Sequence, residues 1–279
     1  ITPQVTGTVG SPVYQSIGNL AIPFSTSEPV ATVTVTVNGR LAIVSGTYLA
    51  TLPISSADAQ GTASVQIRVQ DFAGNSSQTT IPYYCIDTVI PVISGLPTQS
   101  QWVSTGNWTL HFKPNEWVAT PSVTMNGRPM TISTITPSGT GLGIDATISI
   151  LNGDTQGAAA VVITAIDIAG NASTVTFNGL SIDTVLPTVT ATRVQTSAGV
   201  EDLGALYLSD KQWILTFSEP VTPGTITLGS AVAQITQPQS TQLIASFTQS
   251  QLSSVAGTQN LTISGVADRA GNRNLSVVT

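Results

Sequence analysis

Charge is scarce in this sequence. Charged residues make up 8% of its 279 residues, against about 25% in an average soluble domain. Eight Lys and Arg stand against 14 Asp and Glu, which gives a net charge of −6. The basic residues form no cluster that could neutralise phosphates, so nucleic acid is not expected as a partner. Hydroxyl and amide side chains must cover most of the surface instead.

Cysteine and histidine occur once each, as Cys85 and His111. A single cysteine excludes an intrachain disulfide, and the shortage of both residues argues against zinc or copper. A Ser-His-Asp site would need His111, which alternation places on the outer face of a predicted strand, and no Gly-x-Ser-x-Gly string accompanies it. Cys85 has no basic partner nearby in sequence and is expected to be an inert thiol. The sequence therefore predicts no enzyme.

Long apolar runs and helical periodicity are also missing. No apolar stretch approaches the about 20 residues that span a bilayer, and the N-terminus lacks the order of a signal peptide. Membrane insertion is not expected. The chain is rich in Thr and Val, whose β-branched side chains favour strands.

What the sequence does contain is an internal repeat. Asp71-Phe-Ala-Gly-Asn75 returns as Asp167-Ile-Ala-Gly-Asn171 and as Asp268-Arg-Ala-Gly-Asn272, at intervals of 96 residues (71 to 167) and 101 residues (167 to 268). Ile86-Asp-Thr-Val-Ile-Pro91 returns as Ile182-Asp-Thr-Val-Leu-Pro187. Fixed-order repetition at this period indicates tandem modules. We place them at 1–88, 89–184 and 185–279.

Each module is expected to be all-β. The segments before the acidic residues alternate apolar and polar side chains with period two, as in a sheet with one solvated face. Asn38-Gly39 and Asn126-Gly127 favour tight hairpin turns. In the third module Gly265-Val266 shifts the parity of the strand, which predicts a bulge or a register change. The predicted fold is three tandem immunoglobulin-like Greek-key β-sandwiches.

The repeated strings carry a family resemblance. "Asp-x-Ala-Gly-Asn … Ile-Asp-Thr-x-x-Pro", with Phe217-Ser-Glu-Pro-Val221 upstream, resembles the bacterial immunoglobulin-like repeats of large surface adhesins. Ser27-Glu-Pro-Val30 matches the upstream segment, whereas Asn115-Glu-Trp-Val118 keeps the acid and loses the proline. The resemblance covers all three modules. It implies an extracellular, cell-surface protein with roles in adhesion and biofilms.

The acidic residues are concentrated at recurring positions. In the immunoglobulin fold the loop between the second and third strands (B–C), the loop between the last two strands (F–G) and the entering chain lie at one end. A linker Asp, a B–C Glu and an F–G Asp should therefore converge at each junction. Eight of the 14 acidic residues hold these positions: Asp87, Glu116, Asp167; Asp183, Glu219, Asp268; and Glu28, Asp71 in the first module.

Three converging carboxylates repel one another unless a cation lies between them. Ca²⁺ takes six to eight oxygen ligands and suits such a group better than Mg²⁺, which demands stricter geometry. We therefore predict structural Ca²⁺ at the eight residues above. The alternative is that the acids only form turns or caps, or are solvated. The glycines and asparagines of the repeats are expected to act in turns only, and Trp117 to pack between modules.

The first module carries Glu28 and Asp71 without a linker Asp. Ile1 aligns with Val89, so the missing acid would lie just upstream, and we expect the chain to be cut from a longer array. The predicted function is a stalk segment of an adhesin, a rod stiffened by calcium at the module junctions. The predicted partners are neighbouring modules of the longer chain, with host-cell or surface ligands bound by other domains. The alternative is a structural subunit of a phage appendage, filament or surface layer.

Overall fold

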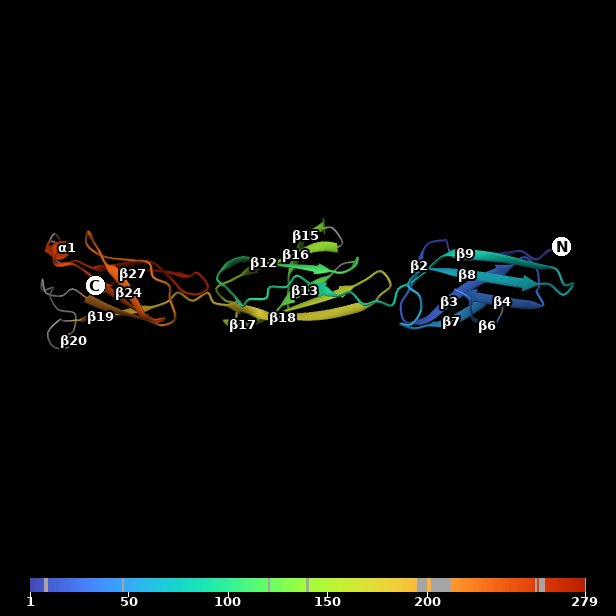
Figure 1. Cartoon of the computed structure of the whole chain (residues 1–279), viewed down its shortest axis with the longest axis horizontal. Helices are drawn as coiled ribbons and strands as arrows, with labels where there is room; N and C mark the ends of the chain where they lie inside the picture. Colours follow the sequence, from blue (N-terminus) through green and yellow to red (C-terminus); the bar gives the residue numbers. More distant parts are fainter. Residues whose placement is uncertain are drawn as a thin grey trace. The chain divides into compact units, whose positions relative to one another are not determined.

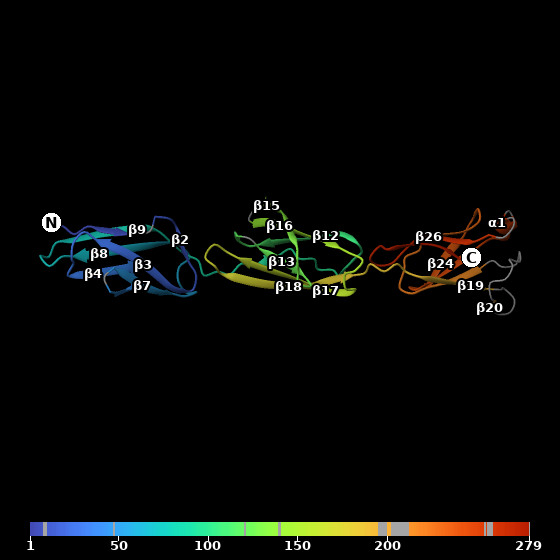
Figure 2. The same cartoon turned by 180° about the vertical axis from the view of Figure 1, so that it is seen from behind.

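The computed structural model describes residues 1–7, 10–46, 48–119, 121–138, 141–194, 200–201, 212–253, 255 and 259–278. These residues form three pairs of β-sheets and one short helix, so the chain is three tandem immunoglobulin-like sandwiches (Figures 1 and 2). Among the described residues no helix is long and apolar enough to cross a membrane.

The first sandwich pairs a four-stranded with a five-stranded sheet. The strands of the first sheet, in spatial order, are β1 (Val5–Gly7), β3 (Gly18–Thr26), β7 (Leu49–Ile54) and β6 (Ile43–Ser45). Those of the second are β2 (Val13–Gln15), β9 (Ser76–Ile86), β8 (Gly61–Gln70), β4 (Thr32–Val37) and β5 (Arg40–Leu41). Strand β2 pairs in parallel with β9 while the other pairs are antiparallel.

Alternation in the sequence explains the core of this sandwich. Leu20 and Ile22 of β3 and Val65 and Ile67 of β8 are at most 1% exposed and belong to one buried cluster. The two strands lie in different sheets, so the cluster joins the two layers. Asn38 and Gly39 have φ of 47° and 82°, which gives the two-residue turn between β4 and β5 that the Asn-Gly string predicted.

The second sandwich repeats this order. One sheet contains β10 (Ile93–Ser94), β12 (Gly106–Pro114), β16 (Gly141–Ile150) and β15 (Thr131–Ser138). The other contains β11 (Gln101–Val103), β18 (Ala172–Ile182), β17 (Gly157–Ile166), β13 (Ser122–Met125) and β14 (Arg128–Pro129). Leu110, Phe112 and Ile163 are buried as the alternation predicted.

The third sandwich differs in detail. One sheet contains β20 (Val200–Glu201), β19 (Val189–Val194), β21 (Gln212–Phe217), β25 (Gln242–Ser246) and β24 (Gln234–Gln239). The other contains β23 (Ala231–Val232), β22 (Thr225–Leu228), β26 (Leu261–Ala267) and β27 (Arg273–Val278), and the helix α1 (Gln249–Ser253) precedes β26. The β26–β27 register shifts between Ser264 and Val266, which confirms the predicted irregularity at Gly265-Val266.

Grouped by the proximity of Cα atoms, the chain divides into two compact units. The first comprises Ile1–Leu96, His111–Ala146 and Val162–Thr176, and the second comprises Pro97–Leu110, Thr147–Val161 and Phe177–Thr279. This division crosses strands of the second sandwich. The module boundaries at 88/89 and 184/185 therefore stay a prediction.

Candidate metal centres

Two groups of three carboxylates form at equivalent places in the fold. Asp87 follows β9, Glu116 lies between β12 and β13, and Asp167 lies between β17 and β18. One carboxylate oxygen from each lies within 4.8 Å of those of the other two. All three belong to the first compact unit. We call this group cluster 1.

Cluster 2 consists of Asp183, Glu219 and Asp268, which all lie in the second compact unit. Asp183 follows β18, Glu219 lies between β21 and β22, and Asp268 lies between β26 and β27. Their ligand oxygens also lie within 4.8 Å of one another. The structure thus brings together six of the eight residues predicted to bind metal, in the two predicted groups of three.

The F–G turn fixes one carboxylate of each cluster. The Asn171 backbone N–H donates to Asp167 Oδ1 at 2.9 Å, and Asn171 Nδ2 donates to Asp167 Oδ2 at 2.7 Å. Asn272 makes the same two bonds to Asp268, at 2.9 and 2.7 Å. Gly170 has a φ of +88°, which L side chains rarely adopt, so its role in the turn is as predicted.

The asparagines do more than form turns. Asn171 Nδ2 also donates to the backbone carbonyl of Asp87 at 2.8 Å, and Asn272 Nδ2 donates to that of Asp183 at 2.8 Å. Each asparagine therefore joins a linker Asp to the F–G Asp of the same cluster. The turn-only interpretation was incomplete, because a bond between residues 84 positions apart leaves no local signal.

Electrostatics at the clusters favour a bound cation. Burial, followed by the charges of Asp183 and Asp268, raises the pKa of Glu219 to about 7. Burial, followed by Asp87 and Asp167, raises the pKa of Glu116. Glu116 Oε1 is buried and has no hydrogen-bond partner among the residues that the structure describes. A cation between the three carboxylates would supply the missing partner and relieve the repulsion.

The donor set fits a hard cation. Both clusters offer only carboxylate oxygens as charged ligands, and Ca²⁺ completes its shell with backbone carbonyls and water. Asp87 Oδ1 accepts the Val89 backbone N–H at 3.2 Å, and Asp183 Oδ1 accepts that of Val185 at 3.2 Å. These bonds turn both linker carboxylates in the same way.

Glu28 and Asp71 occupy the same loops in the first sandwich, but they belong to no group of three ligands among the described residues. Asn75 holds Asp71 through its backbone N–H and its Nδ2, both at 2.8 Å. These bonds, the side-chain one first, lower the pKa of Asp71 against the effect of burial. Asn75 Nδ2 also contacts the Ile1 carbonyl at 3.4 Å. Metal binding at Glu28 and Asp71 stays a prediction.

The residues considered for catalysis, His111 and Cys85, belong to neither cluster. The His111 side chain is 72% exposed and its Nδ1 lies 2.5 Å from Asp145 Oδ1 across β12 and β16. Cys85 is half-buried, and burial, followed by the charge of Asp87, raises the pKa of its thiol. A raised pKa disfavours the reactive thiolate, in keeping with an inert cysteine.

The tryptophans near the clusters are partly exposed. Trp117 is 56% exposed, and its packing between modules stays a prediction. Trp102, which is 40% exposed, instead lies beneath the Arg269 guanidinium, whose Cζ is 5.8 Å from the ring centre. Arg269 follows Asp268 directly in the sequence.

Comparisons with known proteins find only distant structural likenesses. No family model matches the sequence, and no curated protein matches it. Among solved structures, the I-band fragment I67–I69 of titin aligns with all of this chain and 98% of its own length, at 10% identity and a TM-score of 0.47. The fibronectin(III)-like modules of Clostridium thermocellum CbhA align with 65% of this chain and 94% of theirs, at 12% identity and a TM-score of 0.37. At these values the likeness carries no argument about function, and the fold rests on the strands described above.

Proposed function

We propose that this chain is a structural segment of an extracellular surface protein, in which Ca²⁺ at the linkers fixes the orientation of consecutive immunoglobulin-like modules. The observation that carries the proposal is the recurrence of the same three-carboxylate cluster at both linkers. Recurrence suits a structural role, because an active site is needed only once. The chain would have no enzymatic activity and would act as the stalk of a cell-surface adhesin.

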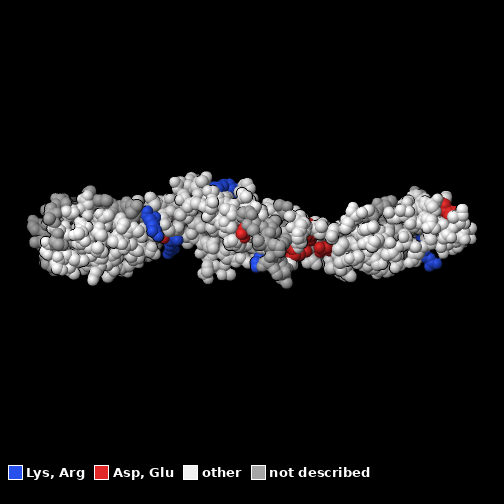
Figure 3. Space-filling view, turned by 90° about the horizontal axis from the view of Figure 1, so that it is seen from above, with Lys and Arg blue, Asp and Glu red and all other residues white. Residues whose placement is uncertain are grey.

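The arrangement of charge supports this proposal. Six of the 14 acidic residues lie in the two clusters. Figure 3 shows acidic side chains gathered in a patch on a face that is otherwise largely uncharged. Each cluster draws one ligand from the linker and two from loops of the following sandwich. An ion bound there would tie the linker to that sandwich.

A calcium titration of the full chain tests the proposal. Calorimetry should detect two bound Ca²⁺ ions per chain, and saturation should raise the melting temperature. A ligand at a hundredfold excess over its Kd stabilises the folded state by about 2.7 kcal/mol. Small-angle scattering should give a narrower distribution of interatomic distances with Ca²⁺ than with chelator. Identical melting and scattering in the two conditions would overturn the proposal.

A further inference from the structure

A second repeated string lies beside the linkers. Asp58-Ala-Gln-Gly61 in the loop between β7 and β8 returns as Asp154-Thr-Gln-Gly157 between β16 and β17. The interval between Gln60 and Gln156 is 96 residues (60 to 156), the same as that of the linker strings. The third module has no Asp-x-Gln-Gly string.

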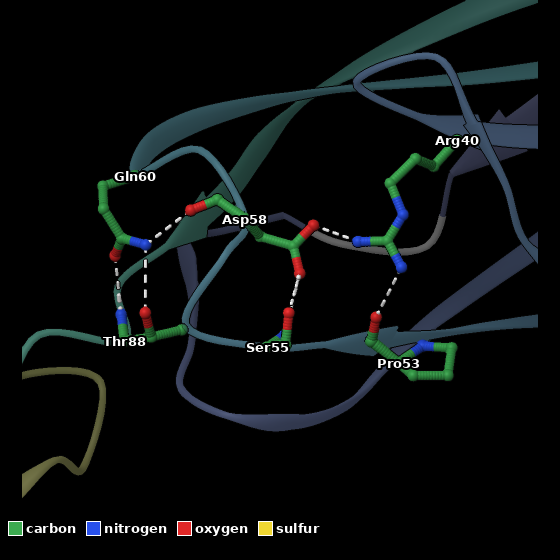
Figure 4. A network of polar contacts seen from close by, with 6 residues as sticks. All are labelled: Arg40, Pro53, Ser55, Asp58, Gln60 and Thr88. Atoms are coloured by element: carbon green, nitrogen blue, oxygen red, sulfur yellow. Dashed lines mark hydrogen bonds and ion pairs between the residues drawn. The ribbon is translucent and has the colours of Figure 1, made fainter.

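Each of these glutamines forms two hydrogen bonds with the threonine that follows a linker Asp. Gln60 Nε2 donates to Thr88 Oγ1 at 3.0 Å, and Gln60 Oε1 accepts the Thr88 backbone N–H at 2.7 Å (Figure 4). Gln156 and Thr184 make the same two bonds, at 3.0 and 2.7 Å. The amide nitrogen donates and the amide oxygen accepts, so the two bonds fix the orientation of the threonine as well as its distance from the glutamine.

The glutamines are themselves braced. Gln60 Nε2 also donates to the Asp58 carbonyl at 2.7 Å, and Gln156 Nε2 does so to the Asp154 carbonyl at 2.7 Å. Asp58 Oδ2 accepts the Ser55 backbone N–H, which closes the loop. Asp58 Oδ2 also accepts the Ser55 hydroxyl, and its other oxygen pairs with Arg40 (Figure 4). Asp154 Oδ2 accepts the Leu151 N–H at 2.9 Å in the same way.

The result is a linker peptide unit bonded on both sides. The carbonyl of the Asp87–Thr88 peptide accepts from Asn171 of the second sandwich, and its N–H donates to Gln60 of the first. The carbonyl of the Asp183–Thr184 peptide accepts from Asn272, and its N–H donates to Gln156. Asp87 and Asp183 contribute these carbonyls, and their side chains are the linker carboxylates of the two clusters.

We propose that Gln60 and Gln156 are positioning residues of the two candidate Ca²⁺ sites. By holding the linker threonine to the preceding sandwich, each fixes the backbone of the linker Asp before the ion binds. The inference rests on the proposed function for its calcium readout. Outer-shell partners that orient a metal ligand typically contribute about 10–100-fold to metal affinity.

Gln156→Ala tests the proposal in the full chain. An Asp87→Asn background disables cluster 1, so calorimetric titration with Ca²⁺ reports cluster 2 alone. The expected result is an affinity at least about tenfold lower than in that background, with the melting temperature in chelator unchanged. Gln66→Ala, on an exposed position of β8, is the matched control and should leave the affinity unchanged.

Two variants of Thr184 distinguish the loss of the hydrogen bond to Gln156 from a general disruption of the structure. Thr184→Ser keeps the hydroxyl and should preserve the affinity, whereas Thr184→Val removes the Oγ1 acceptor and should lower it by less than Gln156→Ala does. Unchanged Ca²⁺ affinity in both Gln156→Ala and Thr184→Val would overturn the positioning role.

Hydrogen exchange in chelator separates this inference from the proposed function. The Thr184 amide should exchange faster in Gln156→Ala than in the parent, with exchange in β17 and β18 unchanged. If the parent bound no Ca²⁺, the proposed function would fail, while this result would still support positioning of the linker by Gln156. Equal Thr184 exchange in parent and variant would contradict it.

Discussion

Glu219 of cluster 2 has a strongly raised pKa. Its pKa is raised to about 7 by burial and by two neighbouring carboxylates, and a protonated Glu219 can donate a hydrogen bond to Asp183. A raised pKa means that this group favours the folded state below its ordinary pKa of 4.5. That contribution is lost as the pH rises through about 7.

Calcium and protons should therefore compete at cluster 2. Because Ca²⁺ needs the ionised carboxylate, its affinity should fall as the pH drops below about 7, by up to about tenfold per pH unit for one competing proton. Glu219→Gln should abolish this pH dependence and lower the affinity by at least about tenfold. Calorimetric titrations between pH 5 and 8 in two buffers of different ionisation enthalpy would measure both the affinity and the proton release.

Glu28→Gln is the matched control, since Glu28 holds the same loop position in the first sandwich outside both clusters. It should leave the affinities of the two clusters unchanged. Calcium binding at cluster 2 that releases no proton at pH 6 would contradict the assignment of the raised pKa to a ligand.

The sequence predicted the cluster acids but not the glutamines that bond the linkers. The six cluster acids could be found from the sequence because Asp and Glu are rare in it and recur at fixed positions of a recognisable fold. Gln60 and Gln156 were missed although they repeat at the same interval. Hydroxyl and amide side chains cover most of the surface of this chain, so a glutamine does not stand out in the sequence. The bond from Gln60 to Thr88 also spans 28 residues, which leaves no local pattern.

Among the elements, strand β26 has an irregularity that the apolar alternation of the sequence predicts, but its close contact with Gly224 is not predicted. The shift at Gly265-Val266 followed from the alternation of apolar residues, and the register confirms it. The sequence did not indicate that Gly224, before β22, lies against this shift. A Cβ added there would lie 2.2 Å from the Ser264 carbonyl oxygen and 2.4 Å from the Val266 nitrogen.

Gly224→Ala should therefore destabilise the third sandwich. Both neighbouring atoms are backbone and cannot rotate away, and overpacking of this kind typically costs about 1–3 kcal/mol. Denaturant unfolding, followed by the fluorescence of the buried Trp213, would measure the loss. Gly153→Ala is the control, because a Cβ there meets nothing within 4 Å. Equal unfolding midpoints for the two variants would contradict the close approach.

For the whole molecule, the two clusters should contribute separately to the stabilisation of the folded chain by Ca²⁺. Cluster 1 lies in one compact unit and cluster 2 in the other, and they share no residue. Mutations at distant sites without shared partners usually have additive effects, within about 0.5 kcal/mol. The two sites should therefore bind Ca²⁺ independently.

Asp87→Asn and Asp183→Asn test this independence, because an Asn side chain can still accept the local backbone N–H while losing the charge. Calorimetry should find the number of tightly bound Ca²⁺ ions reduced from two to one in each single variant and to none in the double variant. The loss of calcium-dependent stability in the double variant should equal the sum of the two single losses within about 0.5 kcal/mol. A single variant that abolished both binding events would show that the linkers act as one cooperative system, since each cluster contains its own complete set of three carboxylates.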